Sequence, residues 1–463
     1  MCIKLSKLNE KKLCEKIFSL EKKFSLFKKK INEVYFWKLI RFSLTQEILR
    51  KKNIYGQAHT NPIPKLIDKI LYLPKALINT HLYGALKRNS QKDYLVFEHP
   101  RKIKVNGEYI DKYTHYIIAD LQKDNYEIID KPYLRKHYDK PSSNRSYFEH
   151  FSVINYLKRE ILPIKINNDD KKFIKKIEKE LEKKFDLKID LLEKVKFRIT
   201  NFKNEVKYFN KLLKKRKPKK VFLVVSYGSE PLIEACRIND VTSIEIQHGT
   251  INKYHLGYSF PKDNDIPYFP DQIYLFGQYW IDSTPLPLEE DELKIYGFPY
   301  LEKRLVEYKD YSKINNQVLF ISQGTIANKL IKIAYKFAKD NKNHKIIYKL
   351  HPGEYDRWKQ DYKILNKAVE LDNFKVVDNN DINLYQLFAE SEYQIGVYST
   401  SIYEGLTLNC KTLLINLPGV EYMEYLIEEG IVKFAENAEQ LNYFIKEDNF
   451  EQNYDKNYFF SGV

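Results

Sequence analysis

Apolar and polar positions along the chain follow two different patterns. Short apolar runs that end in glycine or polar residues recur from the middle of the chain onward, as in "KKVFLVVSYGSE", "VTSIEIQHGT" and "HKIIYKLHPGE". Segments with helical spacing, such as "IANKLIKIAYKFAKD", lie between them. Short buried strands that alternate with helices are typical of βαβ units and a parallel sheet. The pattern therefore predicts an α/β fold, and its two successive runs predict two Rossmann-like domains.

Three regions follow from this pattern. Residues 1–90 are expected to form a helical N-terminal extension. Residues 91–305 are expected to form the first Rossmann-like domain, with a charged helical insertion at about 165–217 and a strand at Tyr94–Phe97. Residues 306–463 are expected to form the second such domain, after a linker near 297–316. An Asn106-Gly107 pair predicts a tight turn.

Composition narrows the class of protein. The 463 residues are 43% hydrophobic and 14% aromatic, which excludes a disordered chain. Four cysteines without a CxxC pair argue against a disulfide framework and for a reducing cytoplasm. Apolar stretches such as Val221–Val225 are far too short to span a membrane, and the first 20 residues do not resemble a signal peptide. We therefore expect a cytoplasmic protein.

The net charge of +16 favours contact with anionic partners. Most of the basic residues lie along charged helices, where solvated faces are the simpler explanation. No nucleic-acid-binding module is recognisable, so we expect no nucleic acid partner. A nucleotide donor, an acidic glycan or peripheral contact with the anionic inner face of the cytoplasmic membrane fits the charge.

Five polar loops follow the predicted strands: "SYGSE", "QHGT", "SQGT", "LHPGE" and "YSTS". Ligands of open parallel sheets bind beyond the C-terminal ends of the strands. In "YSTSIYEG", Ser399, Thr400 and Ser401 precede a helix, where hydroxyls and free N–H groups can bind phosphate. Ordinary N-capping is the alternative. Glu404, one turn later, could accept a hydrogen bond from a sugar hydroxyl, or simply suit the helix N-terminus.

Two further loops of the second domain could complete a phosphate site. His351 and Pro352 follow a strand, and a histidine there can stabilise a departing phosphate. Lys349 lies just before them, and Glu354 just after is a weaker candidate for a base or ribose contact. The loop "SQGT" adds the last three candidates for donor binding, namely Gln323, Gly324 and Thr325.

The first domain offers a general base. His248, at the end of "EIQH", has an intrinsic pKa near neutrality, and Glu230 is the competing carboxylate. Further polar or aromatic residues could line the acceptor side of the same site, namely Glu98, His99, Arg101, His255 and Tyr258.

Several other chemistries lack their motifs. The chain contains no GxGxxG after a strand, no GxxxxGK[ST], no HExxH and no GxSxG. No DxD pair stands where it would bind a metal-diphosphate complex. We therefore expect a metal-independent reaction, with no metal site and no cofactor.

The order "QHGT", "HPGE", "YSTSIYEG" resembles the GT-B glycosyltransferases of bacterial surface (capsule-type) polysaccharide biosynthesis, a group with sialyltransferases, Kdo transferases and teichoic acid glycerophosphotransferases. The resemblance covers about 220–420 well and 90–130 loosely. It implies that His351-Pro352 and Ser399–Ser401 bind the phosphates of a nucleotide such as CMP, and that His248 is the base. The acidic motif of the sialyltransferases has no clear counterpart, which argues against sialic acid transfer.

The combined expectation is an inverting transfer of a sugar from a nucleotide-activated donor to a surface polysaccharide or glycolipid. The second domain would bind the donor and the first the acceptor, facing each other across a cleft. Three alternatives stay open: a CDP-glycerol-type glycerophosphotransferase, a sugar-nucleotide 2-epimerase and a non-catalytic glycan-assembly protein.

Overall fold

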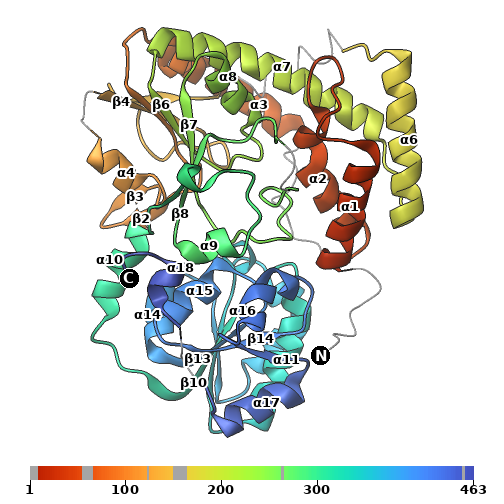
Figure 1. Ribbon diagram of the computed structural model, residues 1–463. Coiled ribbons are helices and arrows are strands. Elements are labelled where there is room, and N and C mark those ends of the chain that lie inside the picture. The colour runs from red at the N-terminus through yellow and green to blue at the C-terminus, as the bar shows by residue number, and fades with distance from the viewer. Residues whose placement is uncertain (1–8, 55–65, 122–124, 150–163, 262–264, 451–453) are drawn as a thin grey trace.

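Two parallel sheets, one above the other in Figure 1, organise the chain. The computed structural model describes residues 9–54, 66–121, 125–149, 164–261, 265–450 and 454–463. Within them, one α/β unit carries a seven-stranded sheet and the other a six-stranded sheet. Two Rossmann-like units whose parallel sheets lie in separate domains are the GT-B arrangement, so the predicted fold class is confirmed.

The first sheet has the order β5-β4-β1-β6-β7-β8-β9, and all its neighbouring strands are parallel. Its strands are β1 (Tyr94–Phe97), β4 (Tyr126–Asp130), β5 (Arg145–Tyr147), β6 (Lys220–Val224), β7 (Thr242–Ile246), β8 (Gln272–Leu275) and β9 (Leu293–Ile295). Strand β1 has the predicted bounds. Strands β4 and β5 come from a stretch for which the sequence pattern indicated no strand, because each is short and flanked by charged residues.

The second sheet has the order β12-β11-β10-β13-β14-β15. Its strands are β10 (Ile314–Ile321), β11 (Lys345–Lys349), β12 (Phe374–Val377), β13 (Ser391–Gly396), β14 (Lys411–Ile415) and β15 (Lys433–Ala435). The central strands read as continuous buried runs, and the last five residues of β10 are all buried. Strands that are apolar on both faces require helices on both sides, which fits a doubly wound sheet.

Both sheets share one topology. The hairpin of β2 (Ile103–Val105) and β3 (Glu108–Ile110) lies outside both sheets. When the strands of each sheet are numbered by their order in the chain, both sheets begin with the spatial order 3-2-1-4-5-6. The order reverses between β1 and β6 in the first sheet and between β10 and β13 in the second. A doubly wound sheet binds its ligand in the crevice at this switch point. The hairpin turns at Asn106 and Gly107, both with positive φ, as predicted.

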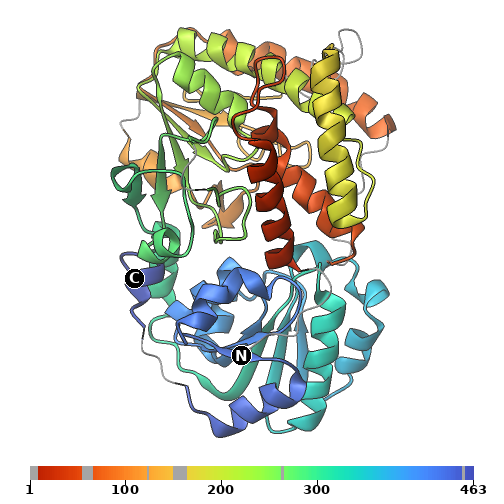
Figure 2. The same cartoon turned by 45° about the vertical axis from the view of Figure 1, so that its right-hand side comes forward.

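The helices of the N-terminal extension join those of the predicted insertion. Helices α1 (Glu10–Phe24) and α2 (Phe36–Lys51) pack against α6 (Asn168–Phe185) and α7 (Leu191–Arg216), as Figure 2 shows for α1 and α6. Helix α6 begins at the N-cap Asn167 and buries Ile174, Ile177 and Leu181 at helical spacing. Helix α3 (Leu66–Tyr83) packs against β5, an edge strand of the first sheet.

The remaining described helices connect or cover the strands. They are α4 (His115–Asp120), α8 (Glu230–Ile238), α9 (Gln278–Asp282), α10 (Pro299–Tyr308), α11 (Ala327–Asp340), α12 (Trp358–Asp361), α13 (Lys363–Ala368), α14 (Leu384–Glu390), α15 (Thr400–Thr407), α16 (Glu424–Glu428), α17 (Ala438–Glu447) and α18 (Lys456–Phe459). Short 3₁₀ turns are η1 (Ala85–Lys87), η3 (Glu290–Glu292), η4 (Pro352–Glu354) and η5 (Val420–Met423). In the described part of the chain no helix is long and apolar enough to cross a membrane.

The C-terminal end of the chain returns to the first domain. The indole Nε1 of Trp280 donates to the carbonyl of Phe459 at 2.7 Å, and the N–H of Ser461 donates to Phe276 at 2.7 Å. The chain therefore passes between the two domains twice, at α10 and again before α18. Sequence periodicity carried no sign of this return.

Gly405 in α15 has a packing role within the "YSTSIYEG" motif. A Cβ at this position would overlap the carboxamide of Gln394 on β13. Gln394 is held by hydrogen bonds of 2.8 Å to the carbonyl of Ile402 and the hydroxyl of Thr412, so it has little freedom to move. We expect Gly405→Ala to lower the free energy of unfolding by about 1–3 kcal/mol, measured by urea denaturation. An unchanged midpoint would mean that Gln394 can be displaced at no cost.

Candidate functional site

The "QHGT" and "YSTS" loops meet at the boundary between the two domains. The N–H of Thr250 donates to the hydroxyl of Thr400 at 3.1 Å, and the two hydroxyls are 3.2 Å apart. A Cβ on Gly249 would lie 3.3 Å from the same oxygen, so glycine permits this close approach. Two loops that are 150 residues apart in sequence thus form one site.

The loops at this boundary come from the switch points and their neighbours. In the first sheet, His99 and Arg101 follow β1, and Tyr227 follows β6. In the second, the "SQGT" loop follows β10, and Ser399 follows β13. His248 follows β7 and His351 follows β11, each one strand away from a switch point. The predicted candidates are therefore arranged where the topology places a ligand.

Positive charge gathers at this boundary. Loss of solvation, followed by nearby cations, lowers the pKa values of His99, His248 and His351, and Arg101 is among those cations in all three cases. The charge of Arg101 therefore acts on all three imidazoles. Within the described residues its guanidinium forms no hydrogen bond or ion pair. An arginine whose guanidinium has no partner among the described residues, and whose charge acts on three histidines, is suited to an anionic ligand.

Lys112 adds a second cation, which was not among the predicted site residues. Its ammonium lies 5.1 Å from the ring of Tyr113, 5.3 Å from Phe298 and 5.9 Å from Tyr300. Burial raises the pKa of Glu404, while the charge of Lys112 and a hydrogen bond from Tyr385 lower it. Glu404 is thus a buried carboxylate whose pKa the charge of a lysine of the other domain helps to lower. Lys112 stands in a charged turn without a motif, so only the fold places it here.

The hydroxyl loop before α15 caps the helix. Ser399 is the N-cap, and its Oγ accepts from the N–H of Ser401 at 3.2 Å. The capping alternative is thus present in the structure, and Thr400 is engaged with Thr250. Ser399 and Ser401 are both half-buried at the boundary. Capping uses the Ser401 N–H and one lone pair of the Ser399 hydroxyl. The O–H of Ser399 is not used by the cap and could donate to a phosphate oxygen.

The "HPGE" loop orients His351. Its Nδ1 accepts from the N–H of Gly353 at 3.1 Å, and this fixes the proton of the neutral ring on Nε2. An imidazole in that tautomer can donate a hydrogen bond to phosphate. Pro352 opens the 3₁₀ turn η4. Glu354 is buried and accepts from the N–H of His351 and the hydroxyl of Tyr362, both at 2.8 Å, so it supports the loop from behind.

The other predicted donor residues divide into two groups. The Lys349 ammonium donates to the Tyr355 hydroxyl at 2.5 Å and to the carbonyl of Asn379 at 2.6 Å, and burial lowers its pKa to about 8. Thr325 shares a hydrogen bond of 2.8 Å with Tyr398. These two already have internal partners.

Gln323 and Gly324 have more freedom to meet a ligand. The buried Oε1 of Gln323 has no hydrogen-bond partner among the described residues, so it can still accept a bond. Gly324 lies beside Glu354 of the "HPGE" loop and beside Arg357, the N-cap of α12; a Cβ on Gly324 would be 3.7 Å and 3.9 Å from these side chains. The loop after β10 therefore adjoins the loop that carries His351.

His248 belongs to a buried relay of polar groups. The hydroxyl of Tyr258 lies 3.5 Å from His248 Nδ1 and donates to Glu245 Oε1 at 2.5 Å. The Tyr227 hydroxyl lies 3.4 Å from Nε2. Glu245, fully buried on β7, has a pKa raised by burial. The glutamate inside the apolar run "TSIEIQ" is the sequence signal for this group, and Glu245 was not among the predicted site residues.

Glu230, the competing base, is engaged elsewhere. It is buried, its Oε2 accepts from the N–H of Gly228 at 2.9 Å, and its Oε1 lies 3.9 Å from the Lys38 ammonium of α2. His255 stacks on Phe42 with ring centroids 5.2 Å apart, and its Nδ1 accepts from the N–H of Gly257 at 3.2 Å. Burial lowers the pKa of His255 to about 4. These contacts favour His248 over Glu230.

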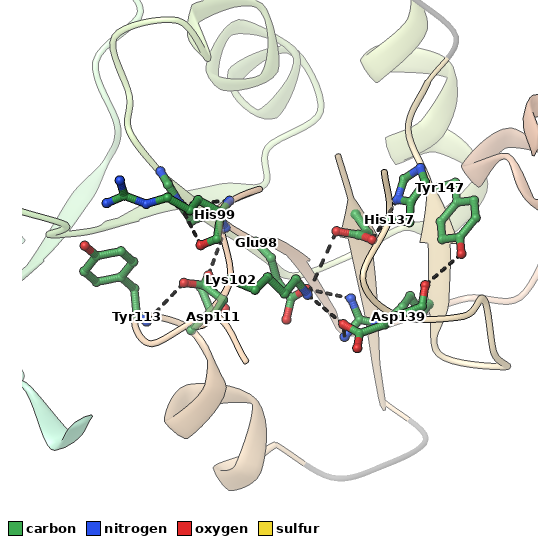
Figure 3. A network of polar contacts seen from close by, with 12 residues as sticks. Glu98, His99, Lys102, Asp111, Tyr113, His137, Asp139 and Tyr147 are labelled. Carbon is green, nitrogen blue, oxygen red and sulfur yellow. Dashed lines mark hydrogen bonds and ion pairs between the residues drawn. The ribbon is translucent and has the colours of Figure 1, made fainter. Parts of the chain in front are cut away.

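The predicted acceptor-side residues after β1 point in different directions (Figure 3). Glu98 accepts from Lys102 and, at 2.6 Å, from Arg145 within a buried ionic network. His99 instead stacks toward His248, with ring centroids 6.5 Å apart. The peptide N–H of His99 donates to Asp111, whose pKa burial raises to about 6. The network thus fixes the loop, and the His99 ring lies toward His248 at the domain boundary.

His248 is expected to titrate differently with and without an anion. Burial, then the charges of His255, His99, Lys112 and Arg101, lower its pKa to about 3, so the ring is neutral at pH 7. A bound pyrophosphate group would offset these charges and raise the pKa. Histidine NMR titration should show an increase of at least about one unit when a nucleoside diphosphate is added. An unchanged pKa would place the anion elsewhere.

Neither a protein-family model nor a curated protein matches the sequence. Among solved structures, the UDP-GlcNAc 2-epimerase of Methanocaldococcus jannaschii aligns at a TM-score of 0.47 and 10% identity, over 80% of this chain and 96% of that chain. The UDP-GlcNAc 2-epimerase of Neisseria meningitidis, bound to UDP-GlcNAc, aligns at a TM-score of 0.45 and 13% identity, over 80% of this chain and 97% of that chain. The wall teichoic acid polymerase TagF aligns at a TM-score of 0.39 and 11% identity, over 82% of this chain and 88% of that chain. These distant likenesses carry no conclusion about the reaction of this chain.

Proposed function

We propose that the protein is an inverting, metal-independent glycosyltransferase. It would move a sugar from a nucleotide-activated donor, with CMP-sugars among the candidates, to a surface polysaccharide or glycolipid. The contact between Thr250 and Thr400 is the observation that carries the proposal. It brings the loop of the candidate base against the loop of the candidate phosphate site, as transfer between two substrates requires.

The donor would lie at the switch point of the second sheet. Its phosphates would accept hydrogen bonds from Ser399 and from Nε2 of His351, with Arg101 closing the site from the first domain. Gln323, whose buried Oε1 is unused among the described residues, would accept from a ribose or base group. In the described residues no three His, Cys, Asp or Glu side chains are grouped to hold a metal ion. Arg101 and Lys112 would instead balance the phosphate charge.

The proposed reaction is a single displacement. The acceptor hydroxyl attacks the anomeric carbon from the face opposite the phosphate and gives its proton to neutral His248. The new glycosidic bond forms as the bond between the anomeric carbon and the phosphate oxygen breaks. The nucleotide then leaves with the electron pair, stabilised by the donors around it. Tyr258 and Glu245 would hold the His248 ring and spread the charge that it gains.

A nucleotide panel tests the proposal. Thermal shift with CMP, CDP, UDP and GDP should show one preferred nucleotide, with stabilisation that rises with ligand concentration. The sugar nucleotide of that base, incubated with and without a glycan acceptor, then separates the reactions. Acceptor-dependent release of nucleotide supports transfer. Interconversion of the donor without any acceptor would identify a 2-epimerase, transfer of glycerol phosphate a glycerophosphotransferase, and the absence of nucleotide binding a non-catalytic protein.

Peripheral contact with an anionic membrane belongs to the same proposal. Helix α3 exposes Leu77, Ile78 and Leu82, each more than half accessible to solvent. An exposed apolar helix face on a cationic protein suits a lipid surface. Leu77→Ser/Leu82→Ser should reduce flotation with anionic vesicles by at least about tenfold. Leu134→Ser, at another exposed leucine, is the control, and equal flotation of all variants would contradict the proposal.

A further inference from the structure

A pocket of about 600 Å³ lies between α1 and the chain segment that follows the "QHGT" loop. This volume is in the range of small-molecule sites. Its walls are mainly apolar and are formed by Phe18, Leu26, Phe27, Phe260, Pro261 and Pro285. None of these residues takes part in the site at the domain boundary. The pocket therefore needs an explanation of its own.

Behind the pocket wall, the Arg41 side chain has all its main polar contacts satisfied. The Arg41 guanidinium lies 5.4 Å from the ring of Phe27 and 4.7 Å from that of Phe260. It donates to the carbonyls of Leu256 and Ser259 at 2.6 Å and 2.7 Å, and it pairs with Glu21 at 2.6 Å. The acidic residue in the lining is thus neutralised. Packed aromatic walls above a satisfied ion pair indicate a preformed cavity.

Three lysines line the pocket beside these apolar walls. Lys22 and Lys28 are exposed, and their ammonium groups have no hydrogen bond or ion pair within the described residues. Lys253 also lines the pocket and pairs with Glu424 of the second domain at 2.5 Å. An apolar cavity with unpaired cations at its surface is complementary to a molecule with an apolar chain and an anionic group.

The pocket and the candidate base share one chain segment. Residues 253–261 contribute Phe260 to the pocket wall and Tyr258 to the relay, 3.5 Å from His248 Nδ1. On α2, Arg41 packs on the Phe260 ring of the pocket wall, while the next residue, Phe42, stacks on His255. A ligand in the pocket would therefore touch the same chain segment that contacts the proposed base.

We propose that this pocket binds the apolar chain of an anionic amphiphile, with its charged head group at Lys22 and Lys28. The role of this ligand rests on the proposed function: it would be the lipid end of a lipid-linked acceptor. Binding in the pocket seats the acceptor on the first domain, on the same side as His248. The chemistry required is a single alkyl or isoprenoid chain joined to a phosphate.

The test uses dodecyl phosphate below its micelle concentration, titrated into the full chain by calorimetry. It should bind more tightly than dodecyl maltoside, which lacks the charge, or inorganic phosphate, which lacks the chain. Phe18→Glu, which places a charge in the apolar wall, should abolish binding of both amphiphiles. Lys22→Glu/Lys28→Glu should weaken dodecyl phosphate by roughly tenfold and leave dodecyl maltoside unchanged. Lys12→Glu, exposed on α1 outside the pocket, is the control.

Two outcomes would overturn the proposal. Unchanged binding to Phe18→Glu would place the amphiphile elsewhere, and equal binding of charged and neutral amphiphiles would remove the role of the lysines. The proposed transfer reaction fails separately, since its nucleotide panel requires no amphiphile. Normal dodecyl phosphate binding without any nucleotide binding would support the proposed pocket ligand and reject the transferase. Nucleotide binding without dodecyl phosphate binding would reject only the proposed pocket ligand.

Discussion

His248→Asn is expected to lower the rate of sugar transfer by roughly 10²- to 10⁴-fold, the contribution of a positioned general base. Asparagine is close to histidine in size and keeps a polar group near Tyr258, but it cannot take the proton of the acceptor. The loss should appear in kcat, with the affinity for the donor nucleotide unchanged. Steady-state kinetics with saturating acceptor measures the first quantity and calorimetry the second.

Two further variants make this prediction specific. His344→Asn replaces a histidine before the start of β11, in the second domain, and should retain full activity. Glu245→Gln can still accept the hydrogen bond from Tyr258 but lacks the carboxylate charge. It should therefore reduce kcat less than His248→Asn does and shift the acid limb of the pH profile of kcat. Full activity of His248→Asn would contradict the assignment of the base, and Glu230→Gln would be the next variant to measure.

The second large effect is expected at the phosphate site. Ser399→Asp retains a good N-cap for α15 but places a carboxylate where a donor phosphate would bind. Two like charges about 4 Å apart repel by about 4 kcal/mol at the dielectric of a partly exposed site, so we expect a loss of nucleotide affinity of at least roughly hundredfold. Thermal stability should not change, because the helix remains capped.

Asn437→Asp provides the matched control, since Asn437 caps α17 in the same domain. It should change neither stability nor nucleotide affinity. The combined His351→Ala/Ser399→Ala variant should lose roughly 10²- to 10³-fold in kcat/KM, the usual effect of removing donors to a developing charge. If the double variant keeps its activity, or Ser399→Asp binds nucleotide normally, the hydroxyl loop serves only to cap the helix.

Sequence alone determined the alternation of strands and helices. Buried parallel strands must be apolar on both faces, and this requirement leaves a local signal in runs such as Val221–Val224 and Ile346–Leu350. Polar loops after those runs could also be recognised, because such loops lie where ligands bind. Candidates such as His248 and His351 were therefore accessible without a structure.

The tertiary structure decided which candidates meet. The contact of Thr250 with Thr400 depends on how the two domains dock, and no local pattern encodes it. The charge of Lys112 acts on Glu404 of the other domain for the same reason. Conversely, Glu98 and Lys349 had the right residue type and position, but the structure gives them internal partners. Direction and pairing depend on packing between segments that are remote in sequence, whereas periodicity records only whether a residue is buried.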